Sequence, residues 1–124
     1  MTDHDTSLMT DAVFHIDVES ARADHSVITL GGRLDAVEAV RLREVLAAAP
    51  VAQVDHLVID LSEVAFVDSA GLAALARARR DRVLRGGTVT LVRPRSEEAM
   101  RVFRLTQFDE IFTMLDTRDG GDPP

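Results

Sequence analysis

The fold of this chain is decided by the stretch LVIDLSEVAFVDSAGL, residues 57–72. Its first five residues are apolar except for Asp60, a pattern typical of a strand that is covered on both faces. An alanine-rich segment with helical periodicity follows from Ser69 onward. The stretch therefore predicts a buried strand that leads into a helix, with Ser69 in the first helical turn.

Ser69 places a hydroxyl group where this helix begins, and two different roles are open to it. The first-turn N–H groups of a helix have no partner within the helix, and the macrodipole is positive there. A serine at that place is suited to cap the helix, which contributes about 1 kcal/mol, or to carry a phosphate that a partner reads. The preceding Asp68 is polar, and the small Ala70 and Gly71 leave the helix start open to an approaching protein.

Further strands and helices are predicted on both sides of this stretch. The additional strands are predicted at 13–18, 26–30, 88–92 and 111–115. Residues 19–25 are expected to form a polar turn between the first two strands, and Gly31-Gly32 to end the second. Helices are predicted at 35–49, at 69–85 with Gly86-Gly87 as its C-terminal cap, and from Ser96 onward. This order predicts an α/β fold with a mixed β-sheet of four to five strands packed with three to four α-helices.

The length of 124 residues and a hydrophobic content of 46% suit a single domain with its own core. We expect that domain at residues 11–117. The polar residues 1–10 are expected to form a flexible N-terminus, and the glycine- and proline-rich residues 118–124 a disordered tail.

The composition excludes several function classes. The chain has no cysteine, which excludes disulfides, thiolate zinc sites and cysteine nucleophiles. A formal net charge of −7 argues against a nucleic-acid partner. The sequence has no run of about 18 apolar residues and no signal-peptide pattern, so we expect a cytoplasmic protein that does not act on a membrane.

The sequence also argues against an enzyme. A serine hydrolase of the α/β type needs a Gly-x-Ser-x-Gly elbow, and the segment around Ser69 lacks the first glycine. The four histidines have no distinctive setting and are expected to be surface or strand residues. A glycine-rich phosphate loop and a cluster of metal ligands are both missing. We therefore predict no catalytic residue, no cofactor and no metal.

Three aspartates lie near strand ends or helix starts, where function gathers in open α/β sheets. Asp35 opens the helix at 35–49 and, with Glu38, has the form of a capping box. For Asp35 and Asp68, both a structural capping or turn role and a role in docking a partner stay open. Asp60 is expected to accept backbone donors at the end of its strand.

The helix at 69–85 is unusually basic. Its arginines are Arg77, Arg79, Arg80, Arg82 and Arg85. Leu72, Leu75, Ala76 and Val83 are expected to form its apolar stripe. Arg79 and Arg82 fall near that stripe and are expected to extend along its edge. The basic side is either a solvated surface or a docking surface for an acidic partner.

At this point the residues resemble a known family. Residues 57–72 resemble the signature of the STAS domain, as found in bacterial anti-sigma factor antagonists. The GRLD turn at 32–35 resembles a second landmark of that family, and the glycine pair at 86–87 and the segment RVFRLT at 101–106 resemble its later landmarks. The similarity covers residues 11–117, nearly the whole chain.

The resemblance implies a partner switch. In that family, the unphosphorylated antagonist binds an anti-sigma factor that is also a serine kinase, and sigma factor is released. The kinase phosphorylates the serine after the aspartate, here Ser69, and a serine phosphatase removes the phosphate. The partner-binding residues that the resemblance implies are Asp35, Asp68, Ser69, Ala70, Gly71 and Leu72.

The chain also departs from the family's pattern. Ala70 replaces a hydroxyl residue that is common after the phosphoserine, and Gln107-Phe108 stand where a Gly-Leu pair is usual. Two other functions also stay open. One is a non-switching STAS subunit of a lipid-transport or signalling-scaffold complex, and the other is a module that senses a small molecule or nucleotide.

Overall fold

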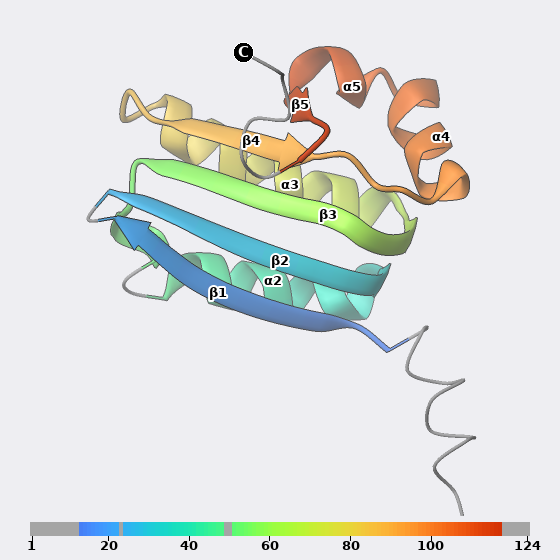
Figure 1. The fold of residues 1–124 in the computed structure, drawn as a ribbon, viewed down its shortest axis with the longest axis horizontal. Coiled ribbons are helices and arrows are strands. Elements are labelled where there is room, and N and C mark those ends of the chain that lie inside the picture. The colour runs from blue at the N-terminus through green and yellow to red at the C-terminus, as the bar shows by residue number, and fades with distance from the viewer. Residues whose placement is uncertain (1–12, 23, 49–50, 118–124) are drawn as a thin grey trace, which may run out of the picture.

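A single five-stranded sheet forms the frame of the molecule (Figure 1). The computed structural model describes residues 13–22, 24–48 and 51–117. The strands are β1 (His15–Arg22), β2 (His25–Leu34), β3 (His56–Val67), β4 (Thr88–Val92) and β5 (Thr113–Leu115), and they lie side by side in chain order. β1 and β2 form an antiparallel hairpin, whereas β2, β3, β4 and β5 are parallel to one another. The predicted α/β class and mixed sheet are confirmed.

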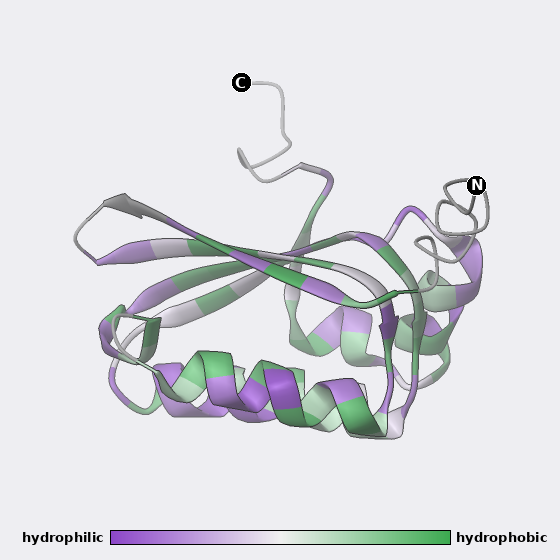
Figure 2. Ribbon diagram, turned by 90° about the horizontal axis from the view of Figure 1, so that it is seen from below, coloured by the Kyte–Doolittle hydropathy of each residue, from purple (hydrophilic) through white to green (hydrophobic). Residues whose placement is uncertain are grey.

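The helices in the described residues are α2 (Ala36–Ala47), α3 (Ser69–Val83), α4 (Glu97–Leu105) and α5 (Phe108–Ile111), with one 3₁₀ turn, η1 (Val51–Gln53). Figure 2 shows α2 and α3 on the same side of the sheet. None of these helices is long and apolar enough to cross a membrane. The predicted flexible N-terminus at 1–10 and disordered tail at 118–124 lie outside the described residues, and the domain bounds 11–117 stay a prediction.

The core forms where α2 and α3 pack against β2 and β3. Alternate side chains of a strand point to the same face, so Ile28 and Leu30 of β2 and Leu57, Ile59 and Leu61 of β3 enter one apolar cluster. Removing each such side chain from water contributes about 1.5–3 kcal/mol. Fully buried members of the cluster include Ile28, Leu30, Leu42, Ile59 and Leu75.

The β1–β2 hairpin is confirmed, but its predicted limits are wrong. β1 continues to Arg22 and β2 begins at His25, so residues 19–25 are mostly strand. β2 also runs through Gly31 and Gly32 instead of ending there. At Gly32 the φ angle is +89°, and a Cβ atom would lie 2.4 Å from the Val13 carbonyl oxygen. Glycine is needed at residue 32 because the backbone at Val13 passes too close to leave room for any side chain.

The C-terminal elements differ from the prediction in a similar way. β3 extends beyond the predicted 57–61 to Val67. The last strand begins at Thr113, later than predicted, because the short helix α5 occupies the residues before it. Gln107 turns the chain between α4 and α5 with a left-handed φ of 64°. The predicted cap of α3 is confirmed, since Gly86 has a φ of +82° and donates its N–H to the Val83 carbonyl at 3.0 Å.

The end of α3 packs in a way that the apolar pattern did not predict. Val83 was expected in the apolar stripe but is 47% exposed, whereas Arg82 is only 3% exposed. Its guanidinium donates to the Val51 carbonyl at 2.7 Å, and that of Arg85 donates to the Val54 carbonyl at 2.7 Å. These two arginines bind the connection before β3 to the end of α3, because the carbonyls of that segment need donors.

Candidate functional site

The starts of α2 and α3 lie next to each other at one edge of the sheet. The last residues of β2 and β3, Leu34 and Val67, are register partners in the parallel pair. Asp35 and Asp68 follow directly, and the Asp68 N–H donates to the Leu34 carbonyl at 3.3 Å. Two helix N-termini, each with its positive end of the macrodipole, therefore meet at this edge.

Both aspartates cap the helices that they precede. Asp35 Oδ1 accepts the Glu38 N–H at 3.1 Å, which confirms the capping role. Asp68 Oδ1 accepts the Gly71 N–H at 3.0 Å. The Glu38 carboxylate contacts Arg41 at 2.9 Å. Any docking role of the two aspartates stays a prediction.

Ser69 is not the cap of α3. A capping residue needs an extended backbone outside the helix, and Asp68 has it, with φ −116° and ψ −174°. Ser69 is the first residue inside the helix, and its side chain is exposed. The capping role considered for Ser69 is therefore wrong, because the preceding aspartate performs it.

The next three residues of the predicted partner-binding set support the helix start. Gly71 is buried, and a Cβ atom on it would lie 2.6 Å from the Leu34 carbonyl oxygen. Leu72 is 4% exposed and belongs to the core, and Ala70 packs partly buried against it. Of the six residues, Ser69 is the one that the structure leaves most open, since Asp35 and Asp68 are partly buried.

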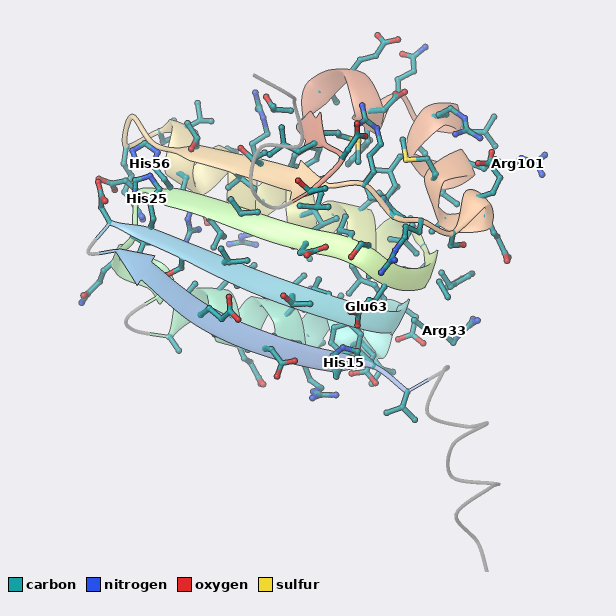
Figure 3. The ribbon with its side chains drawn as sticks, in the orientation of Figure 1. His15, His25, Arg33, His56, Glu63 and Arg101 are labelled. Carbon is teal, nitrogen blue, oxygen red and sulfur yellow. The ribbon has the colours of Figure 1, made fainter. Side chains whose placement is uncertain are left out.

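Two features of this edge were not singled out in the sequence. Arg33 places its guanidinium carbon 3.9 Å from the ring centroid of Phe66, its register partner on β3. Figure 3 shows Arg33 at the same end of the sheet as His15 and Glu63. On α2, Val37 and Val40 are 71% and 44% exposed. The sequence carried this signal, because the two valines lie outside the helical spacing of the buried Ala39 and Leu42.

The remaining polar candidates have structural contacts. Asp60 accepts the Ser62 N–H at 2.9 Å, which confirms its role as an acceptor of backbone donors, although it lies within β3 and not at the end of the strand. His15 lies 3.3 Å from Glu63, and His25 and His56 contact each other at the opposite end of the sheet (Figure 3). All three are exposed or partly buried strand residues, as predicted, and His4 lies outside the described residues. Among the described side chains, no three His, Asp or Glu are grouped as a metal site requires.

The division of roles between Asp68 and Ser69 leads to a stability prediction. Asp68→Ala is expected to lower the free energy of unfolding by about 1 kcal/mol, because it removes the cap of α3. Asp68→Asn keeps an equally good cap, and Ser69→Ala is expected to stay within about 0.5 kcal/mol of the wild type. Urea unfolding of the three variants measures these values. An equal loss in Ser69→Ala and Asp68→Ala would contradict the assignment.

The chain is similar to known proteins in sequence and in fold. The STAS domain family matches residues 15–120. The anti-sigma-B factor antagonist of Listeria monocytogenes is 30% identical over 96 residues, which are 77% of this chain and 83% of that protein. A crystal structure of an anti-sigma factor antagonist from Mycobacterium paratuberculosis superposes with a TM-score of 0.75 at 29% identity, over 89% of this chain and 92% of that one.

A more distant structure shares the fold alone. SpoIIAA superposes in its unphosphorylated form with a TM-score of 0.72 at 21% identity, over 85% of this chain and 90% of that one. Its phosphorylated form superposes with a TM-score of 0.66, over 85% and 94% of the two chains. The family match over residues 15–120 confirms the resemblance inferred from residues 57–72. Because the family match extends from β1 past β5, the chain belongs to the STAS domain family.

Proposed function

We propose that this chain is a cytoplasmic anti-sigma factor antagonist, itself without enzymatic activity, that is switched by phosphorylation of Ser69. The observation that carries the proposal is the position of Ser69, exposed on the first turn of α3 while Asp68 makes the capping bond. A phosphate on Ser69 Oγ removes no capping bond, so it changes the surface and leaves the fold intact.

The unphosphorylated surface suits a protein partner. Exposed Val37 and Val40 offer apolar contact area, and Asp35 and Asp68 lie beside Ser69 with their carboxylates partly buried. In the proposed cycle, an anti-sigma factor with serine kinase activity binds here and releases its sigma factor. Relatives named anti-sigma factor antagonists, at 29% and 30% identity, support this assignment.

Phosphorylation changes the charge of this surface sharply. The Ser69 oxygen attacks the γ-phosphorus of ATP, ADP leaves, and the hydroxyl proton passes to the kinase. The phosphate adds about −1.5 to −2 charges. The positive end of α3 partly stabilises that charge, while the carboxylates of Asp35 and Asp68 repel it. A partner that docks on this edge then meets bulk and negative charge, and dissociates until a serine phosphatase restores the hydroxyl.

A pull-down with the cognate anti-sigma factor kinase tests the proposal. Wild-type chain is expected to hold the kinase without ATP and to release it after ATP is added. Ser69→Ala is expected to hold the kinase in both conditions, because it cannot accept phosphate. Ala70→Ser is a matched control with a hydroxyl on the neighbouring residue, and it is expected to respond to ATP as the wild type does. Equal release of wild type and Ser69→Ala would contradict the proposal, as would no binding at all.

A further inference from the structure

A groove of about 340 Å³ lies between α2 and α3, away from the helix starts. On α2 it is bordered by Arg43 and Leu46. On α3 the lining residues run from Ala74, in the middle of the helix, to Arg82, near its C-terminal end. Its volume is at the lower end of the range for small-molecule pockets, roughly 300–1,000 Å³.

The charge of this groove contrasts with that of the chain. The chain has a formal net charge of −7, but three arginines, Arg43, Arg77 and Arg82, line the groove, and Asp81 is the one acidic residue in its lining. Arg43 and Arg77 are exposed. The remaining lining is apolar and includes Leu46. This combination suits a molecule with an anionic head and a small apolar body.

Arg82 gives the second, independent observation. It is 3% exposed, and one of its terminal nitrogens donates to the Val51 carbonyl at 2.7 Å. Its Nε is buried and has no hydrogen-bond partner among the described residues. A buried charged donor without an acceptor is costly, so a negative charge placed close to this guanidinium would be favourable.

The electrostatic surroundings of Arg82 also lack a full counter-charge. Burial and the neighbouring Arg85 lower the pKa of its guanidinium, and the carboxylates of Asp81 and Asp55 oppose that shift only in part. Arg85 lies 3.4 Å from Asp55, so that carboxylate already has a cationic partner. An added negative charge in the groove would therefore favour the charged form of Arg82.

We propose that this groove binds a small organic anion, with a carboxylate or phosphate head held by the exposed Arg43 and Arg77, close to the positive charge of the buried Arg82, and an apolar body on Leu46 and the alanines of α3. The site is distinct from Ser69, which lies at the other end of α3. The proposal does not depend on the switch, and either can fail without the other. Guanidinium groups suit this role because they bind carboxylate and phosphate through paired, charge-assisted hydrogen bonds.

NMR titration of the ¹⁵N-labelled chain at constant ionic strength tests the site. The probes are benzoate and phenyl phosphate, with benzyl alcohol as the uncharged control. Saturable shifts of the Ala74 and Ala78 amides are expected with one or both anions. Binding of benzoate but not of phenyl phosphate would indicate a carboxylate ligand, and the reverse result would indicate a phosphate ligand.

A double variant and a matched control give the decisive comparison. Arg43→Ala with Arg77→Ala removes two exposed side chains and is expected to weaken binding by about tenfold or more, because two charge-assisted contacts are lost. Arg41→Ala with Arg80→Ala removes two exposed arginines from the same helices outside the groove, and wild-type affinity is expected. Unchanged affinity in the first variant would overturn the proposal. Three other results would also overturn the proposal: amide shifts with benzyl alcohol equal to those with the anions, no saturable shift with either anion, or binding of an acidic peptide but of neither small anion.

Discussion

Gly71→Ala is expected to lower the free energy of unfolding by about 2 kcal/mol and the Tm by several degrees. Alanine is the better helix former, which favours the variant by about 1 kcal/mol. The steric effect acts in the opposite direction and is larger, since the new Cβ atom would lie 2.6 Å from the Leu34 carbonyl oxygen and 2.9 Å from Val67 Cγ2. The oxygen belongs to the backbone of β2, so relief requires α3 to move away from the strand.

Thermal and urea unfolding measure this effect, with Ala73→Gly as the matched control. Ala73 is exposed on the same helix, so its substitution reports helix propensity alone and is expected to cost about 1 kcal/mol. A Gly71→Ala chain as stable as the wild type would mean that α3 does not begin so close to β2. In that case the adjacency of Asp35 and Asp68 would also be wrong.

Ser69→Glu is expected to weaken binding to the anti-sigma factor kinase by about 100-fold, which corresponds to about 2.7 kcal/mol. In the complex, the partner surface that covers Ser69 would have to bury the new glutamate carboxylate without a counter-charge. Asp35 and Asp68 lie beside it and add like-charge repulsion. The Tm is expected to change little, because residue 69 is exposed and the cap belongs to Asp68.

Ser69→Gln separates charge from size in this measurement. Glutamine has nearly the shape of glutamate but no charge, so the Ser69→Gln chain is expected to bind the kinase with most of the wild-type affinity. Isothermal titration calorimetry with the kinase in the presence of a non-hydrolysable ATP analogue gives the three affinities. Equal affinities for the glutamate and the wild-type chain would contradict a charge switch at this residue. Equal losses for glutamate and glutamine would mean that bulk alone is responsible.

The parts of the fold that follow from periodicity could be predicted from the sequence. The apolar run at 57–61 and the alanine-rich segment after it predicted β3 and α3, and the Asp35 cap was predicted from its spacing to Glu38. The errors occur where tertiary contact overrides a local signal. Gly31-Gly32 looks like a break in the sequence but lies inside β2, because Gly32 allows a close approach of the backbone at Val13 and Gly31 leaves room for the His15 ring.

The candidate site shows the same limit. The sequence identified Ser69 and Asp68 but did not decide which of them caps α3, since both residue types are good caps. The burial of Arg82 could not be predicted either, because the need for its donors arises from the Val51 carbonyl on a different segment. The groove beside it depends on that burial and on the packing of α2 against α3, and neither is visible in a helical pattern.

Phosphorylation mapping tests the central claim most directly. The chain, Ser69→Ala and Ser62→Ala are each incubated with the cognate kinase and ATP, and the phosphate is located by mass spectrometry. We predict one phosphate on Ser69 in the wild type and in Ser62→Ala, and no phosphate in Ser69→Ala. Equal labelling of all three chains, or a phosphate at another residue with Ser69 unmodified, would contradict the account.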